Sequence, residues 1–167
     1  MTVWLVLILL IVAVFGGANA AAFLQPAKNR NPKALHPEFL GRLERWLAAA
    51  RVAFPHLEFS IGEGRRTLTR QRWLFGVGRT HTLKSRVVTW TLLSMHRWGL
   101  AADIVIVRKT ARGVAIWDTS VWQHVFAVIP PSKFGLESLV PTEWNHLQIV
   151  DANSVVARQS LKGLTQT

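Results

Sequence analysis

Two imidazoles and two carboxylates lie in two short segments of the sequence, and together they could bind a metal ion. The segment between His96 and Asp103 includes a glycine and two alanines, and Asp103 opens an apolar β-branched run. Glu143 and His146 stand three residues apart at the start of another apolar segment. A catalytic zinc ion uses three nitrogen or oxygen ligands of this kind and keeps a fourth position for water. The four residues therefore meet the requirements of a mononuclear zinc hydrolase, with one carboxylate left over as a proton acceptor.

Each pair needs a particular backbone path to take part in such a site. Gly99 permits a close turn within the first pair. Residues three apart on an extended strand do not share a face, so the second pair requires a bend at residues 144–145. Taken alone, each pair is equally compatible with a loop histidine and an ordinary carboxylate at a strand end. The combination of all four residues is what favours a metal site.

The composition limits which residue types could bind the metal and which partners the chain could attract. The 167 residues contain no cysteine, which excludes disulfides and thiolate zinc sites, so a metal must be bound by His, Asp or Glu. The net charge of +11 predicts attraction to polyanions. No block of consecutive Lys or Arg and no recognition motif indicates nucleic acid, but charge alone does not choose among nucleic acid, an anionic membrane surface, an anionic cell-wall polymer and a basic surface that aids solubility. Of these, we expect an anionic envelope surface and no nucleic acid as the partner.

The first 24 residues carry no charged side chain and are mostly apolar. As a helix, about 20 residues would span roughly 30 Å, the thickness of a bilayer core. Residues 18–20 fit the small-x-small pattern of a signal-peptidase site. We expect residues 1–24 to be a signal peptide or membrane anchor. A cleaved leader, a permanent anchor and a weak anchor that later leaves the membrane stay open, as does the topology, because the basic residues follow the apolar run.

The remaining sequence predicts a linker, one domain and a tail. Residues 25–37 are polar and proline-containing, as in a linker. Residues 38–152 form the predicted domain, and residues 153–167 a flexible tail, with fraying expected from Asp151. Hydrophobic periodicity predicts helices at 38–54, 68–75 and 118–128, and strands at 57–61, 87–92, 102–107, 114–117 and 144–150. This pattern favours an α+β fold, a small antiparallel sheet with flanking helices, preceded by one N-terminal hydrophobic helix.

The two motifs together resemble a known family, the zinc D-Ala-D-Ala carboxypeptidases and L-alanyl-D-glutamate endopeptidases. This family includes vancomycin-resistance D,D-peptidases and phage endolysins, and shares its fold with the hedgehog signalling domain. The matching motifs are Ser94-x-His96-x-x-Gly99-x-Ala101-x-Asp103 and Glu143-Trp144-x-His146. A further run is similar to the endopeptidase branch: Gly64-Arg65-Arg66-Thr67, Gln71, Leu74 and Gly78-Arg79-Thr80.

The resemblance implies roles for individual residues. It makes His96, Asp103 and His146 the zinc ligands and Glu143 the catalytic base. It also implies that Arg66 binds substrate or stabilises the oxyanion. Further candidates for substrate contacts are Ser94, as a supporting residue, and Gln71, Trp98 and Trp144, as residues facing the cleft. Two departures from the pattern of the endopeptidase branch leave undecided which peptide bond is cut. Arg65 replaces the aromatic residue usual in the family, and the Glu-Trp-x-His form is typical of the D,D-carboxypeptidase branch.

The function implied is that of a zinc peptidase acting on peptidoglycan stem peptides. An endolysin-type L-alanyl-D-glutamate endopeptidase is favoured. The alternatives are a D-Ala-D-Ala carboxypeptidase of wall maturation or resistance, and a catalytically silent zinc- or envelope-binding module. We expect a monomer in the cell envelope, in the periplasm or on the outer face of the membrane. It would be secreted, anchored through residues 1–24, or held at the inner membrane until lysis.

Overall fold

The computed structural model describes residues 24–110, 114–139 and 143–155. These fall into two compact units, which are called unit 1 (residues 24–27 and 69–92) and unit 2 (residues 28–68 and 93–155). Apart from Leu24, the predicted leader lies outside the described residues. Within the described ranges, no helix is both long and apolar enough to cross a membrane.

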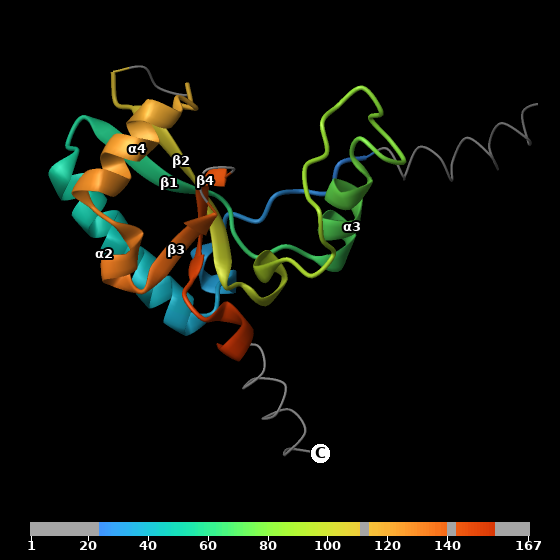
Figure 1. Ribbon diagram of the computed structural model, residues 1–167, viewed down its shortest axis with the longest axis horizontal. Coiled ribbons are helices and arrows are strands. Elements are labelled where there is room, and N and C mark those ends of the chain that lie inside the picture. The colour runs from blue at the N-terminus through green and yellow to red at the C-terminus, as the bar shows by residue number, and fades with distance from the viewer. Residues whose placement is uncertain (1–23, 111–113, 140–142, 156–167) are drawn as a thin grey trace, which may run out of the picture. The chain divides into compact units, whose positions relative to one another are not determined.

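Unit 2 is built on a four-stranded antiparallel sheet (Figure 1). Its strands are β1 (Leu57–Glu63), β2 (Ala101–Arg108), β3 (Leu136–Leu139) and β4 (Glu143–Ile149), in the spatial order β1-β2-β4-β3. All three neighbouring pairs run antiparallel. Together with the helices, this gives the α+β architecture predicted from the sequence.

Two amphipathic helices bury their apolar faces in unit 2. They are α2 (Pro37–Ala53) and α4 (Thr119–Val128), within one or two residues of their predicted bounds. The helix α4 begins where predicted, because Asp118 Oδ1 accepts a hydrogen bond from the backbone N–H of Ser120. Their buried residues at helical spacing are Phe39, Leu43, Trp46, Leu47 and Ala50 in α2, and Trp122 and Val125 in α4.

The strand β2 has one face in the core and one directed away from it. Ala102, Ile104 and Ile106 are fully buried and belong to the same cluster as the helix residues. Since side chains alternate along a strand, Asp103 points to the opposite face. The sheet thus separates the apolar core from the face on which the candidate ligands lie.

The free edge of β1 is covered by two arginine side chains. Arg51 Nη2 donates a hydrogen bond to the carbonyl oxygen of Phe59 at 3.0 Å. Arg30 Nε donates to the carbonyl oxygen of Gly62 at 3.2 Å. Arg30 lies in the predicted linker, which in the structure also contains the short helix η1 (Pro32–Ala34). Part of this segment therefore contacts the edge of the sheet.

Residues 87–92, predicted as a strand, form none. They follow α3 (Leu68–Gly76) in unit 1, where they run irregularly. The carbonyl oxygens of Thr89 and Thr91 accept hydrogen bonds from the side chains of Arg79 (2.9 Å) and Gln71 (2.7 Å). The alternating sequence misled the prediction because side chains, and not a neighbouring strand, bind this backbone.

Three other differences concern short elements of unit 2. The predicted strand 114–117 is reduced to one bridge between Ala115 and Val107. The short strand β3, which follows the helix η3 (Pro131–Phe134), was not predicted because four residues give little periodicity. The predicted fraying from Asp151 is wrong for residues 152–155, because these residues are helical and both Ala152 and Val155 are buried. The rest of the predicted tail lies outside the described residues.

Candidate metal centre

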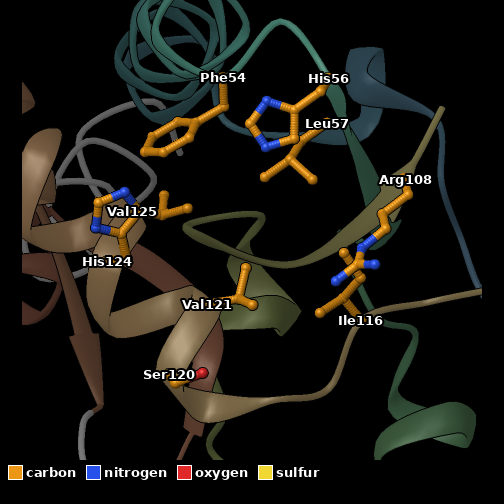
Figure 2. Close-up of a pocket in the computed structure, with 9 residues that line it drawn as sticks. All are labelled: Phe54, His56, Leu57, Arg108, Ile116, Ser120, Val121, His124 and Val125. Carbon is orange, nitrogen blue, oxygen red and sulfur yellow. The ribbon is translucent and has the colours of Figure 1, made fainter. Parts of the chain in front are cut away.

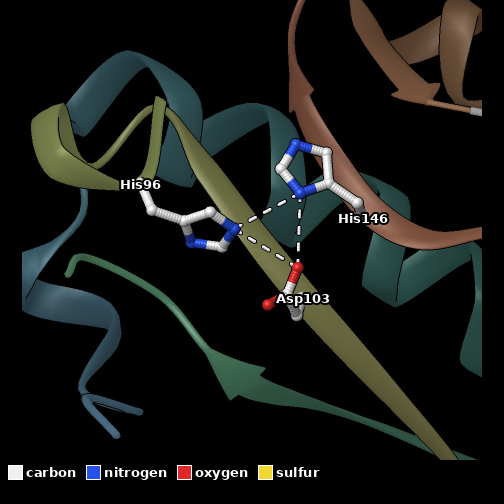
Figure 3. A group of neighbouring side chains, drawn as sticks. All are labelled: His96, Asp103 and His146. Atoms are coloured by element: carbon white, nitrogen blue, oxygen red, sulfur yellow. Dashed lines mark hydrogen bonds and ion pairs between the residues drawn. The ribbon is translucent and has the colours of Figure 1, made fainter. Parts of the chain in front are cut away.

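His96, Asp103 and His146 converge in unit 2 and offer three potential metal ligands (Figure 3). Asp103 Oδ1 lies 3.2 Å from His96 Nε2 and 3.3 Å from His146 Nδ1, and the two nitrogens are 3.3 Å apart. Tetrahedral zinc with bonds of about 2.0–2.2 Å requires ligand atoms about 3.3–3.6 Å apart. The three atoms therefore have close to the mutual spacing of three ligands of one zinc ion.

His96 is positioned by a single turn of 3-10 helix, η2 (Met95–Trp98), that ends at Gly99. Gly99 has a φ of 71°, and a Cβ there would lie 2.9 Å from the backbone nitrogen of His36. Both the conformation and this contact oppose any other residue. The carbonyl oxygen of His96 accepts the N–H of Arg66 at 2.9 Å. The predicted close turn is present, and it holds a fully buried His96.

Strand pairing brings Asp103 and His146 together. Asp103 in β2 is the direct partner of His146 in β4. Opposite residues of an antiparallel pair project from the same face, so both side chains lie on the side away from the core. His146 is 5% exposed and the Asp103 side chain 21% exposed, so the ligand atoms are largely shielded from bulk water.

The carboxylate of Glu143 lies near His146 Nδ1 because strand β4 is irregular at its start. Ser138 of β3 pairs with Leu147, whereas the next residue, Leu139, pairs with Glu143, so residues 144–146 have no counterpart in β3. This is the bend predicted at residues 144–145. It places Glu143 Oε2 3.9 Å from His146 Nδ1. The glutamate side chain is 46% exposed and can exchange protons with solvent.

Hydrogen-bond partners determine which nitrogen of each histidine ring, in His96 and His146, carries no proton. The carbonyl oxygen of Gly64 can only accept, so His96 Nδ1 donates to it at 2.7 Å and Nε2 of the neutral ring carries no proton. Gln148 Nε2 donates to Glu137 Oε1 at 2.7 Å. Gln148 Oε1 is then left to accept from His146 Nε2 at 3.1 Å. His146 Nδ1 is consequently the unprotonated nitrogen of its ring.

These tautomers leave the three central atoms without a hydrogen to share. Two lone-pair nitrogens and a carboxylate oxygen face one another at 3.2–3.3 Å, which is repulsive unless a cation, either a proton or a metal ion, lies between them. Imidazole nitrogen and carboxylate oxygen are ligands that zinc accepts, and outer hydrogen bonds that fix the ring tautomer are typical of zinc sites. The donor set, its spacing and its support therefore fit a zinc ion.

Asp103 is also paired with Arg66. Arg66 Nη2 donates to Asp103 Oδ2 at 2.6 Å, and Arg66 Nε lies 3.1 Å from Glu63 Oε2. In the metal-free protein, burial raises the pKa of Asp103. With a proton in place of the metal between these atoms, hydrogen bonds from His146 and His96, the charge which that proton gives His96, and the charge of Arg66 outweigh burial and lower that pKa well below its usual range. Asp103 is therefore ionised at neutral pH, as a metal ligand must be.

The other predicted site residues have varied surroundings. Ser94 immediately precedes η2 and is half-buried. Trp98 and Trp144 are also half-buried, and both pack against the core cluster. Gln71 is fully buried in unit 1, where its amide donates to the backbone of residue 91. Contacts of these side chains, and of Arg66, with a substrate stay predictions.

Two residues that support the centre were not predicted as site residues. Glu63 pairs across the sheet with Asp103, after a break in register at Gly62, and is 4% exposed. Gln148 fixes the ring of His146 through its side-chain oxygen. Strand periodicity was an available signal for Gln148, because residues two apart share a face. Glu63 gave no comparable signal, since its position depends on the break in register.

A separate pocket of about 470 Å³ lies in unit 2 (Figure 2). Its apolar lining is flanked by three nitrogen-bearing side chains, those of His56, Arg108 and His124. Arg108 lies five residues beyond Asp103 on β2, about 16 Å along the strand. Neither histidine belongs to a metal-binding group within the described part of the chain. The pocket is therefore distinct from the candidate metal centre.

Comparisons with known proteins identify the fold. No protein-family model matches the sequence, and no curated protein matches it. Among solved structures, the L-Ala D-Glu endopeptidase ChiX of Serratia marcescens is 21% identical with a TM-score of 0.51, over 75% of this chain and 88% of that chain. A vancomycin-resistance D,D-pentapeptidase, VanY, in complex with Zn(II), is 18% identical with a TM-score of 0.50, over 74% and 76%.

The LD-carboxypeptidase LdcB, from a structure concerned with peptidoglycan recognition, is 20% identical with a TM-score of 0.52, over 82% of this chain and 68% of that one. At such identities the likeness concerns the backbone fold. It confirms the fold implied by the sequence motifs. The chain has the α+β fold that is shared by the ChiX endopeptidase, the VanY pentapeptidase and the LdcB carboxypeptidase.

Proposed function

We propose that the chain is a zinc-dependent peptidase that cleaves the stem peptides of peptidoglycan. The observation that carries the proposal is the triangle of ligand atoms at 3.2–3.3 Å, with Glu143 Oε2 3.9 Å from one of them. Support comes from the fold, which is that of an endopeptidase, a zinc-containing D,D-pentapeptidase and an LD-carboxypeptidase.

The mechanism assigns different tasks to the residues of the centre. Zinc held by His96, Asp103 and His146 would supply Lewis-acid chemistry, polarising the scissile carbonyl and lowering the pKa of water to about 7. Glu143 accepts a proton from the attacking water and returns it to the leaving amine. Arg66 keeps Asp103 oriented and ionised through its hydrogen bond to Oδ2, and its predicted contact with the substrate oxyanion is part of the proposal.

The favoured reaction is cleavage between L-Ala and D-Glu, because the run around Arg66, Gln71 and Arg79 resembles the endopeptidase branch. The Glu-Trp-x-His form of residues 143–146 favours the second candidate, removal of a terminal D-Ala. Mass spectrometry of muropeptides digested by the zinc-loaded chain separates the two. The first reaction leaves L-Ala on the muramyl group, and the second releases free D-Ala from pentapeptides.

A digest without any cleaved product, by protein shown to contain zinc, would leave the third candidate, a silent zinc- or envelope-binding module. The exposed carboxylate of Glu143 argues against that outcome. We also propose that the protein acts as a monomer in the cell envelope, near anionic polymers that its charge of +11 attracts. Attraction of this kind weakens as salt increases.

A further inference from the structure

Residues 83–92 of unit 1 expose an unusual amount of apolar surface. Leu83 is 71% exposed, Val88 49%, Trp90 80% and Leu92 39%. These four are a third of the twelve exposed large hydrophobic side chains in the described residues, although they come from only ten positions. A cluster of this kind marks an interaction surface more often than scattered single residues do.

Side-chain hydrogen bonds hold the backbone of part of this segment. Arg79 and Gln71 bind the carbonyl oxygens of Thr89 and Thr91, which ties alternate positions of the segment to α3 and the turn after it. Val88, Trp90 and Leu92 lie at the intervening positions. These hydrogen bonds hold the backbone of the segment, on which Val88, Trp90 and Leu92 are exposed.

The surrounding charge is entirely positive. Residues 69–92 contain five Arg and Lys and no Asp or Glu. Lys84 and Arg86 are exposed, and neither forms an ion pair with another described residue. Both lie between Leu83 and Val88 in the sequence, so cationic and apolar groups occur in the same short loop.

We propose that residues 83–92 bind the surface of an anionic phospholipid bilayer. A soluble polyanion would neutralise Lys84 and Arg86 but would leave the apolar side chains in water. An anionic bilayer offers phosphate groups to the cations and an acyl boundary to Leu83, Val88 and Leu92. Trp90 suits the interface itself, where tryptophan rings are enriched. The proposal rests on residues 83–92 alone and does not depend on the proposed peptidase activity.

The absence of cysteine permits a direct test on the full-length chain. Val88→Cys, labelled with an environment-sensitive fluorophore, is titrated with phosphatidylglycerol vesicles and, separately, with phosphatidylcholine vesicles. We expect a blue shift and brighter emission with the anionic vesicles only. The matched control is Val52→Cys on α2, an exposed valine (82%) outside the loop, whose label should respond to neither. Far-UV circular dichroism checks that each variant folds.

Three further variants test the chemistry of the contact in the labelled chain. Lys84→Gln and Arg86→Gln should each raise the phosphatidylglycerol concentration for half-maximal response about fivefold, given about 1 kcal/mol per basic residue near an anionic surface. Trp90→Ser should reduce the blue shift at saturation. Equal responses at positions 88 and 52, or unchanged titrations in all three variants, would overturn the proposal. A matching blue shift with lipid-free polyglutamate would also overturn it, in favour of a polymer partner.

Discussion

The metal centre buries its polar side chains, whereas the loop of residues 83–92 exposes apolar ones. At the centre, His96 and His146 are 1% and 5% exposed, and the nitrogen that each directs away from the centre has a hydrogen-bond acceptor. In the loop, Trp90 is 80% exposed, and Arg86 forms no ion pair with other described residues. One region holds its side chains in fixed positions, whereas the other presents them to solvent.

The difference follows from what each region is proposed to bind. A metal ion requires ligand atoms placed within a few tenths of an ångström, which demands buried, hydrogen-bonded side chains. A bilayer surface needs charge and apolar area but no exact geometry. Substitutions at the centre should therefore alter metal binding or catalysis, and substitutions in unit 1 should leave both metal affinity and core stability nearly unchanged.

The largest effect is expected from Glu143→Gln. Removal of the proton acceptor should lower stem-peptide cleavage by about two to four orders of magnitude, while zinc content stays at one equivalent. Turnover of muropeptides and metal analysis on the same sample measure both. Glu58→Gln, at an exposed position on β1, is the control and should keep full activity. Full activity of the Glu143 variant would mean that another group takes the proton.

Gln148→Leu tests the hydrogen bond that fixes His146. Without its acceptor, the ring loses the tautomer and orientation that direct Nδ1 to the metal, and zinc affinity should fall about 10–100-fold. Competition with a fluorescent chelator measures the dissociation constant. Gln123→Leu, at an exposed position on α4, is the matched control. Equal affinities in the two variants would show that the side chain of Gln148 has no part in holding the metal.

Gly99→Ala should destabilise unit 2. A left-handed conformation costs a residue with a Cβ about 1–2 kcal/mol, and the new methyl group would meet the backbone of His36. Gly41→Ala provides the opposite case, because its Cβ would have space on α2 and should stabilise the helix by about 0.5–1 kcal/mol. Urea unfolding of both variants measures the free energy of unfolding. A neutral Gly99 variant would contradict the positive φ.

The smallest effect is expected from Gln71→Ala in unit 1. Loss of the hydrogen bond to Thr91, worth about 1 kcal/mol, should speed amide hydrogen exchange in residues 87–92 about fivefold. Zinc affinity should stay unchanged, which would show that the loop can be altered without an effect on the metal centre. A loss of zinc affinity comparable with that of the Gln148 variant would show that the metal centre and the loop of residues 83–92 are not independent.

The sequence predicted the parts of the fold that depend on local pattern. The helices α2 and α4 and the strand β2 were predictable because their apolar residues repeat with a clear period. The meeting of Asp103 and His146 was expected from the paired motifs, and the structure supplies it through strand register. Glu63 and the irregular segment 87–92 were not predictable, because their surroundings come from residues distant in sequence.

The arginines along β1 have a consequence for how the protein meets other chains. An exposed edge strand is a template on which a further strand can form hydrogen bonds. Here guanidinium groups already occupy the carbonyl oxygens of Phe59 and Gly62. A second copy, or an extended peptide, would have to displace both arginines before it could lengthen the sheet from this side. The sheet is thereby protected against growth into aggregates at β1.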